Sequence, residues 1–190
     1  RAGAPPSLRR CRFAQVRNPG SDPELADLYE QIRAAGFGSP LNWFTAQAER
    51  PDILKVTFAF CRAIMVGGLL PPTIKQMIVV LVSALNHCDY CRLTHRRALR
   101  SLDVPNEVID HITTGLTLSK VPPQQRAVLQ FAAKASQAPR SLTDRDFDEL
   151  RDYGLSDGEL IEVAMTAALT RFINIWASAS AIEVDAEAAS

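Results

Sequence analysis

Two cysteines three residues apart, followed by a histidine four residues later, are the residues of this sequence best placed for redox chemistry. In a helix, Cys88 and Cys91 are i,i+3 and Cys91 and His95 are i,i+4, so the three side chains would share one face. The thiolate is the reactive form of cysteine, and a neighbouring imidazole can take its proton. A second cysteine can then convert a sulfenic acid into a disulfide. The spacing therefore indicates a dithiol redox site.

Other interpretations of the same residues have less support. The two cysteines could bind zinc with His95 and His87, but structural zinc sites usually take a second ligand pair from a distant segment. The sequence has no such pair, so we expect neither a metal nor another cofactor. His87 is more simply a surface histidine, and His111 a structural one. Cys61 lies in an apolar run and resembles a small buried hydrophobe, whereas Cys11 lies in a basic N-terminal stretch.

A buried helix is predicted to lead directly into the cysteines. It begins at Pro71-Pro72 and is apolar nearly all round up to Leu85, which is typical of a central helix. At Asn86 the character changes, and the sequence leaves open whether the helix continues or a new one begins near the cysteines. A new helix would place unpaired N–H groups beside the sulfur and favour its negative form.

The remaining elements are also predicted to be helices, because prolines and capping residues introduce apolar runs of helical spacing. We find no alternating strand pattern and no hairpin signal, so the fold class is all-α. Residues 1–20 carry five Pro or Gly residues and no periodic apolar face, which predicts a flexible arm before a single domain over 21–183 and a tail over 184–190. The predicted helices cover 21–36, 51–67, 105–114, 122–137, 143–153 and 156–181, with a short segment over 41–50.

Composition narrows the functional classes. The chain has 190 residues, 47% hydrophobic and 22% charged, which is enough to bury a core. Lys+Arg and Asp+Glu both number 21, and this balance argues against nucleic acid as a partner. No signal peptide is visible, and the apolar run Met77–Leu85 is shorter than the roughly 20 residues that cross a bilayer. We therefore expect a cytoplasmic protein that does not enter a membrane.

The stretch Met77 to His95, MIVVLVSALNHCDYCRLTH, resembles the signature of the AhpD-like alkylhydroperoxidases. These belong to the carboxymuconolactone decarboxylase superfamily, and the sequence is most similar to its peroxidase-related branch. The resemblance extends to Leu41-Asn42-Trp43-Phe44 before the core and to the run from Arg171 to Ala177 near the end. It implies an AhpD-like helical fold over about residues 24–183, assembled into homo-oligomers, often trimers or hexamers.

The resemblance also implies a function and residue roles. It implies that a hydroperoxide is reduced by a dithiol, which a thiol or a lipoylated protein then reduces again. The second family cysteine, here Cys91, attacks the peroxide, and the first, here Cys88, resolves it into a disulfide. The family histidine falls on His95, which belongs to a proton relay that deprotonates the attacking thiol.

One position departs from the family pattern. The relay includes a glutamate about three turns before the first cysteine, and Gln76 stands there. A glutamine can orient a partner through hydrogen bonds but cannot accept a proton. Losing one base could cost on the order of 10² to 10⁴ in rate. Glu49, Asp89 or Glu162 could substitute, and the sequence does not choose among them.

The sequence therefore predicts a thiol-dependent peroxidase and leaves alternatives open. With little peroxide turnover, the intact dithiol would suit a thiol–disulfide reductase or a redox sensor. The Gln76 substitution also admits a non-catalytic helical oligomer. Lactone decarboxylation, the reaction of the namesake branch, ranks below these because that branch does not depend on a CxxC pair.

Overall fold

The computed structural model describes residues 11–114 and 118–186, and every regular element in these ranges is a helix. The all-α prediction is therefore confirmed, and most helices begin within two residues of the predicted position. The elements are α1 (Pro23–Ile32), η1 (Arg33–Phe37), α2 (Asn42–Thr45), α3 (Pro51–Met65), α4 (Pro72–Leu85), α5 (Asp89–Ser101), α6 (Asn106–Thr114), α7 (Pro123–Gln137), η2 (Pro139–Ser141), α8 (Asp144–Asp152) and α9 (Asp157–Ser180).

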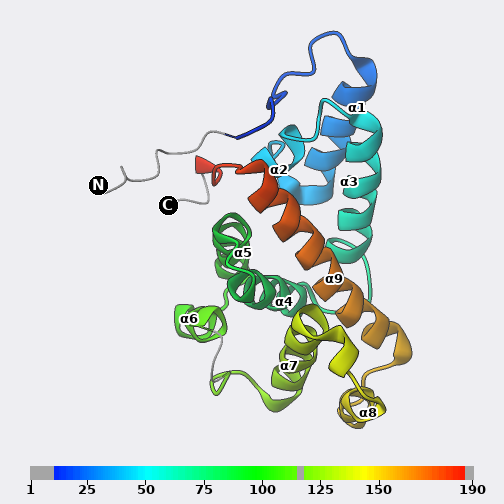
Figure 1. The fold of residues 1–190 in the computed structure, drawn as a ribbon, viewed down its shortest axis with the longest axis vertical. Coiled ribbons are helices and arrows are strands. Elements are labelled where there is room, and N and C mark those ends of the chain that lie inside the picture. Colours follow the sequence, from blue (N-terminus) through cyan, green and yellow to red (C-terminus); the bar gives the residue numbers. More distant parts are fainter. Residues whose placement is uncertain (1–10, 115–117, 187–190) are drawn as a thin grey trace, which may run out of the picture.

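Helix α9 is the axis of the molecule. It runs from α7 and α8 at one end to α1, α2 and α3 at the other, while α4 and α5 pack against its middle and α6 packs on α4 and α5 (Figure 1). A capping box starts it, in which Ser156 and Glu159 each bind the other's backbone N–H. Its length and hydropathy would also suit a membrane span, but 56% of that window is buried inside the protein. This burial is what a core helix of a folded domain requires.

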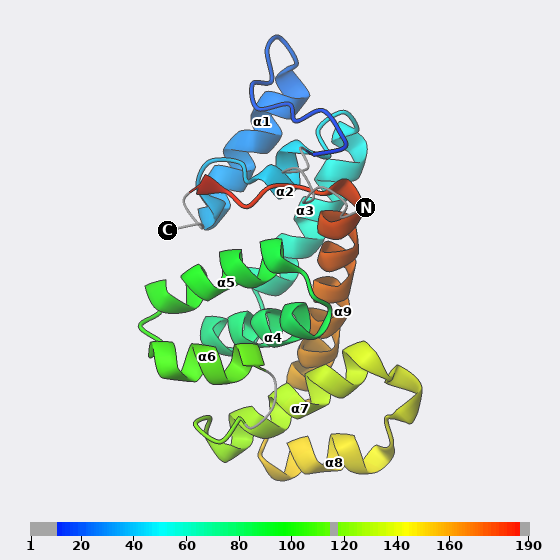
Figure 2. The same ribbon diagram turned by 60° about the vertical axis from the view of Figure 1, so that its left-hand side comes forward.

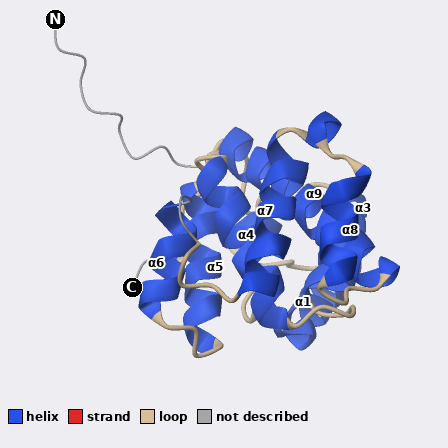
Figure 3. Ribbon diagram, turned by 90° about the horizontal axis from the view of Figure 1, so that it is seen from below, coloured by secondary structure: helices blue, strands red, loops and turns tan. Residues whose placement is uncertain are grey.

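Two apolar clusters lie on either side of α4. The larger one joins α4, α6, α7 and α8 to the first half of α9, and the smaller one joins α1, α2 and α3 to its second half (Figure 2). Both sulfurs of the CxxC motif belong to the smaller cluster. Seen end-on, the helices surround α4, which accounts for its apolar character on nearly every side (Figure 3).

The chain breaks between α4 and α5, which settles the question that the sequence left open. Asn86 leaves helical geometry and His87 has a φ of 54°, in the left-handed region. Cys88 is extended and is the residue that precedes the first turn of α5, with its N–H bonded to the Ser83 carbonyl at 2.9 Å. A new helix therefore begins at the cysteines.

The described part of the predicted N-terminal arm lies against the domain. The Arg12 N–H donates to the Ser180 carbonyl at 2.8 Å, and the Val16 N–H donates to the Thr45 carbonyl at 3.1 Å. Residues 1–10 of that arm, and residues 187–190 of the predicted tail, lie outside the described ranges. The described stretch of the arm thus crosses the end of α9 that lies nearest the cysteines.

Candidate active site

The two sulfurs of the CxxC motif form a close, reduced pair. Their Sγ atoms lie 3.0 Å apart, within hydrogen-bond distance, and neither is in a disulfide. Both side chains are buried, with Cys88 3% and Cys91 2% exposed. A disulfide bond measures about 2.05 Å, so closing one requires the sulfurs to approach by roughly 1 Å. The break before α5 allows this, because Cys88 lies outside the helix that fixes Cys91.

The three predicted site residues share the start of one helix but not one continuous helical face. Cys91 and His95 are one turn apart within α5, as their spacing predicts, whereas Cys88 precedes the helix in extended conformation. At that position Cys88 precedes the first turn of α5, and the backbone N–H of Cys91 in that turn helps to lower the pKa of Cys88. Cys88 therefore precedes α5, whereas the sequence analysis placed Cys88 and Cys91 on one face of a single helix.

The hydrogen bond between the two sulfurs shifts their pKa values in opposite directions. The hydrogen bond with Cys91 lowers the pKa of Cys88 to about 7, with further help from the Cys91 backbone N–H. The same hydrogen bond, followed by burial, raises the pKa of Cys91 above its usual range. In the reduced pair the thiolate therefore forms more readily on Cys88, with the Cys91 thiol donating to it. The lowered pKa therefore favours Cys88 as the nucleophile, whereas the family resemblance gives the attacking role to Cys91.

Gln76 contacts the histidine of the motif directly. Its Oε1 lies 2.6 Å from Nδ1 of His95, although the two residues are 19 positions apart in sequence. An amide oxygen only accepts, so Nδ1 carries the hydrogen and the lone pair of the neutral ring is on Nε2. Burial lowers the pKa of His95 to about 4, which keeps the ring neutral near pH 7. No hydrogen bond joins His95 to either sulfur within residues 11–114 and 118–186.

The three carboxylates that could replace a relay glutamate have other surroundings. Asp89 forms an ion pair with Arg92 at 2.8 Å on the exposed side of α5. Glu162 forms an ion pair with Lys75 at 2.7 Å. Glu49 is solvent-exposed before α3. Burial is what lowers the pKa of His95, and no carboxylate contributes to that shift. In the described residues, the relay position is filled by Gln76 alone.

Polar groups of α9 complete the surroundings of the sulfurs, and the sequence analysis missed them. Asn174 is 3% exposed, its Nδ2 donates to Oγ of Ser83 at 3.0 Å, and it acts to lower the pKa of Cys91 against the stronger effects that raise it. Ser178, one turn later, helps to lower the pKa of Cys88. The signal that was available is a single asparagine within the apolar run from Phe172 to Trp176. In a buried helix, an amide in that position requires a polar partner.

Tyr90, between the two cysteines, is tied to the C-terminal segment. Its hydroxyl donates to Oδ2 of Asp185 at 2.7 Å and accepts from the Trp43 N–H at 3.2 Å. The other carboxylate oxygen of Asp185 accepts from the Asn42 N–H at 2.8 Å. These bonds join the CxxC turn to α2 and to the chain after α9. They hold the segment that carries both sulfurs from a side away from α4.

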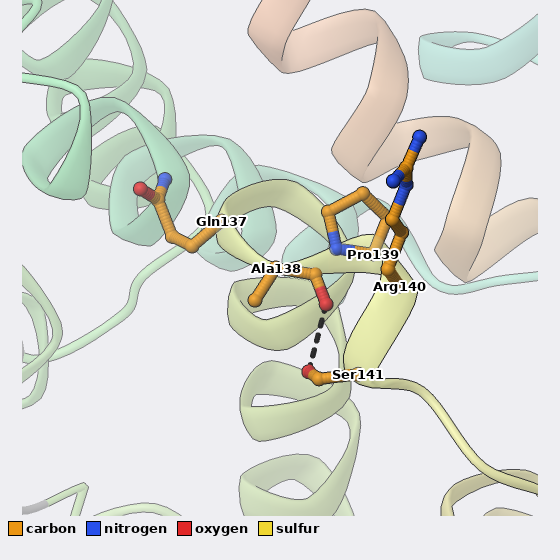
Figure 4. A pocket seen from close by; sticks show the side chains of 5 residues that line it. All are labelled: Gln137, Ala138, Pro139, Arg140 and Ser141. Carbon is orange, nitrogen blue, oxygen red and sulfur yellow. Dashed lines mark hydrogen bonds between the residues drawn. The ribbon is translucent and has the colours of Figure 1, made fainter.

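Among the described residues the sulfurs belong to no group of metal ligands, and they do not line the hollow at the end of α7. Over the described ranges, no three His, Cys, Asp or Glu side chains are grouped so as to hold a metal ion. A shallow hollow of about 550 Å³ lies instead at the end of α7 (Figure 4). It is lined by Gln137, Ala138, Pro139, Arg140 and Ser141. It meets the site only through Gln137, whose Nε2 donates to Oδ1 of Asn86 at 2.8 Å.

Comparisons with known proteins agree with this geometry. Residues 51–134, which include α4 and the CxxC motif, match the model of the Carboxymuconolactone decarboxylase family. The chain is 28% identical to an alkylhydroperoxidase AhpD core structure, an uncharacterized peroxidase-related protein from Ralstonia eutropha JMP134. That match covers 95% of both chains at a TM-score of 0.84. A peroxidase-related protein from Silicibacter sp. TM1040 is 25% identical over 97% of both chains, at a TM-score of 0.82.

A further structure shares the fold at lower identity. The debrominase Bmp8, in complex with 2,3,4-tribromopyrrole, is 22% identical over 94% of this chain and 96% of its own, at a TM-score of 0.77. The curated proteins contain no sequence that matches this chain. Residues 51–134 thus match the Carboxymuconolactone decarboxylase family, and the chain as a whole has the helical fold of the two AhpD-like, peroxidase-related structures.

Proposed function

We propose that this chain is a thiol-dependent peroxidase that reduces a hydroperoxide through the Cys88/Cys91 dithiol. The observation that carries the proposal is the 3.0 Å separation of two reduced, buried sulfurs at the start of α5. The family match over residues 51–134 and the similarity to two peroxidase-related structures support a peroxidase-related role. The shared proton further supports it, because one sulfur of the pair ionises close to neutral pH.

The proposed cycle has two steps. The thiolate of Cys91 attacks the terminal oxygen of the hydroperoxide, the O–O bond breaks, and the alcohol leaves with a proton. The resulting sulfenic acid is attacked by the sulfur of Cys88, which forms the disulfide and releases water. One dithiol and one hydroperoxide thus give one disulfide, one alcohol and one water. A thiol or a lipoylated protein then returns two electrons to the disulfide, and no cofactor is required.

His95 is proposed as the proton acceptor for the attacking thiol. With Nδ1–H bonded to Gln76, the lone pair of Nε2 remains available, and the ring is neutral at physiological pH. Gln76 holds the ring but cannot take the proton further. The proton therefore has to leave His95 to solvent, and we expect turnover below that of a site with a carboxylate at this position.

The peroxidase proposal is tested by counting free thiols with and without one equivalent of hydroperoxide. We expect the wild type to lose two thiols rapidly. We expect Cys88→Ser to accumulate a trapped sulfenic acid and Cys91→Ser to be inert. A reaction of the wild type no faster than that of free cysteine would refute the peroxidase function. A sulfenic acid in Cys91→Ser would instead keep the function and transfer the attacking role to Cys88, as its lowered pKa favours.

A thiol–disulfide reductase or redox sensor is the second candidate. The neutral pair His95 and Gln76 favours it, because neither residue carries a charge that drives proton transfer. This candidate predicts that the Cys88–Cys91 disulfide exchanges rapidly with a dithiol such as dihydrolipoamide, while the reduced protein reacts slowly with hydroperoxide. A non-catalytic helical oligomer would do neither. Measuring both rates on one preparation separates the three.

We also propose that the chain acts as a cytoplasmic homo-oligomer, a trimer or hexamer. Exposed apolar side chains on α9 at heptad-like spacing support self-association: Ile161 at 65%, Met165 at 39%, Phe172 at 40% and Ile175 at 63% exposure. Light scattering of the wild type and of Ile161→Glu/Ile175→Glu tests this assembly. We expect the double variant to form a smaller assembly with unchanged helix content. An unchanged molar mass would mean that α9 does not form the interface.

A further inference from the structure

The two sulfurs are closed to solvent in a site that has to admit other molecules. Cys88 and Cys91 are 3% and 2% exposed, and the helices α4, α5 and α9 around them pack on one another. A hydroperoxide and a reducing thiol must each come within bonding distance of a sulfur. Some part of the chain therefore has to move aside, and a segment outside the helical core can do so without unfolding the protein.

Residues 181–185, which follow α9, form such a segment, the C-terminal strap. Ala181 has a φ of 52° and ends α9, and residues 182–185 belong to no helix or strand. The strap runs between α2 and α5 (Figure 2). Ile182 is buried and Val184 is partly buried in the apolar cluster that contains both sulfurs. The strap is thus a non-helical cover on this cluster.

One carboxylate makes most of the polar contacts that hold the strap down. Oδ2 of Asp185 accepts from the Tyr90 hydroxyl at 2.7 Å, and Oδ1 accepts from the Asn42 N–H at 2.8 Å. A third bond runs from Nδ2 of Asn42 to the Glu183 carbonyl at 2.9 Å. Hydrogen bonds to an ionised acceptor are about twice as strong as neutral ones. Asp185 is therefore the main polar attachment of the strap.

Tyr90 connects this attachment to the dithiol itself. It stands between the two cysteines in sequence, is 7% exposed, and its hydroxyl also accepts from the Trp43 N–H at 3.2 Å. When Asp185 leaves, the hydroxyl loses its acceptor, and a buried polar group without a partner is costly unless water replaces it. Release of the strap therefore brings solvent to the turn that carries both sulfurs.

The N-terminal arm crosses the same end of the molecule but is not bonded to the motif. Arg12 donates through Nη1 to the Ala179 carbonyl at 2.7 Å and through its N–H to the Ser180 carbonyl at 2.8 Å. Among the hydrogen bonds of the described residues, none joins the arm to residues 88–91. The strap, by contrast, is bonded to the residue that separates the two cysteines.

We propose that the C-terminal strap is a gate over the dithiol and that the Asp185 carboxylate is its latch, bonded to Tyr90 and Asn42 in the closed state. The purpose of the gate, admission of a hydroperoxide and of a reducing thiol, rests on the proposed dithiol function. When the carboxylate releases both donors, the strap lifts and the sulfurs become accessible while the helices stay in place. A segment held by so few bonds opens far more often than the whole protein unfolds.

The test measures how fast iodoacetamide labels the cysteines of the native, reduced protein, and it needs no peroxide. Peptide mass spectrometry gives a combined rate for Cys88 and Cys91 and a separate rate for Cys61. Cys61 is the internal reference, because it is 6% exposed on α3 in the same apolar cluster but does not lie beside the latch. We expect Asp185→Ala to raise the combined rate at least tenfold and to leave the Cys61 rate unchanged.

Glu183→Gln is the matched control. It removes one negative charge from the same strap, but Glu183 is exposed and bonds Asn42 only through its backbone carbonyl. We expect its labelling rates to equal those of the wild type. A faster rate in Asp185→Ala is then due to the lost latch and not to the lost charge.

A second variant keeps the test decisive if Asp185→Ala does not fold. Tyr90→Phe keeps the ring and removes one of the two donors to the carboxylate, so we expect the combined rate to rise about tenfold relative to Cys61. The proposal is overturned if the ratio of the two rates stays at its wild-type value in Asp185→Ala, or in Tyr90→Phe where Asp185→Ala does not fold. An equal rise at Cys61 also leaves that ratio unchanged, and it would mean that Asp185 stabilises the whole domain and gates nothing.

The outcome is separable from that of the proposed function. If the labelling rates change as expected but hydroperoxide does not consume thiols, the gate stands and the peroxidase function fails. If hydroperoxide consumes two thiols and Asp185→Ala leaves the ratio of labelling rates unchanged, the function stands and the gate fails.

Discussion

Lys75 and Gln76 are neighbours on α4, yet they serve two regions of opposite character. Lys75 lies 2.7 Å from the carboxylate of Glu162 on α9, with side-chain exposures of 2% and 9%. Gln76 lies 2.6 Å from His95 on α5, in a partly buried contact between neutral groups. The first contact is fully charged and closed to water, and the second carries no charge.

The charged contact holds a connection in place. Nζ of Lys75 also donates to the Ile64 carbonyl at 2.9 Å, and the second carboxylate oxygen of Glu162 accepts from the Leu69 and Leu70 N–H groups at 2.5 and 3.3 Å. Gly68, within the same connection, has a φ of 97°, and a Cβ on it would lie 2.2 Å from Oε1 of Glu162. The ion pair therefore fixes the path from α3 to α4.

The difference between the two regions follows from what each must do. A buried ion pair strongly disfavours any state in which one partner is missing, which suits a contact that never changes. A site that moves protons needs arrangements of similar free energy, and neutral partners provide them. On α4, an ion pair therefore fixes the connection to α3, whereas a hydrogen bond between neutral side chains serves the reactive site.

The largest expected effect is on the charged region. Glu162→Ala leaves the Lys75 ammonium buried without its counter-charge, and we expect the free energy of unfolding to fall by about 3 to 5 kcal/mol. Urea unfolding measures this. The double variant Lys75→Met/Glu162→Leu removes both charges and should recover much of the loss. A double variant as unstable as Glu162→Ala would mean that the carboxylate acts through the Leu69 and Leu70 amides rather than through charge.

The next-largest effect is expected when a charge is introduced into the contact between Gln76 and His95. Gln76→Glu places a carboxylate 2.6 Å from Nδ1 of His95, and a nearby negative charge favours the imidazolium. We expect the pKa of His95 to rise well above its value of about 4, as measured by NMR titration. The carboxylate can also pass the proton on, so hydroperoxide consumption should rise on the order of 10²-fold. A raised pKa with an unchanged rate would show that proton transfer through His95 does not limit the reaction.

Local signals were sufficient to predict the helices. Pro51, Pro72 and Pro123 stand at helix starts, Ser156 and Glu159 form the capping box of α9, and the apolar periods between them matched the observed helices. The end of α4 at Asn86 was the exception, because local signals did not show whether the helix stops there. A helix can continue through Asn86-His87-Cys88, and only the packing of α5 across α4 and α9 shows why it does not.

The candidate site was predictable only where its residues are close in sequence. The spacing of Cys91 and His95 gave their relation, because one helix carries both. The polar partners of the sulfurs come from α9, more than 80 residues later, and a single asparagine in an apolar run does not state which group it faces. The relation of Gln76 to His95 came from the family resemblance. Partners joined by tertiary packing leave no local pattern.

Low pH should lower the free energy of unfolding through protonation of His95. The pKa of this residue is about 4 in the folded protein because of burial, against a reference value of 6.5. Between pH 6.5 and 4 the unfolded chain therefore binds a proton that the native protein does not, and stability falls as the pH falls. Since part of the residue reaches solvent, we expect a loss of about 2 kcal/mol rather than the full value.

His95→Gln isolates this contribution from that of the carboxylates. The variant has no group that titrates at this position, so its loss of stability between pH 7 and pH 4.5 should be smaller than that of the wild type. Urea unfolding at both pH values gives the difference. Equal losses in the two proteins would mean that the His95 ring is hydrated and titrates normally.

The smallest expected effect comes from an exposed ion pair of similar length to the buried one. Asp89 and Arg92 are 2.8 Å apart on α5, but the Asp89 side chain is 77% exposed. Water screens such a pair, so Asp89→Asn should change the free energy of unfolding by about 0.5 kcal/mol or less. Asp89 also raises the pKa of Cys88 slightly, so Asp89→Asn should move the alkylation profile of Cys88 toward lower pH. If the variant were instead as unstable as Glu162→Ala, distance rather than burial would set the strength of these pairs, and the contrast between the two regions of α4 would lose its physical basis.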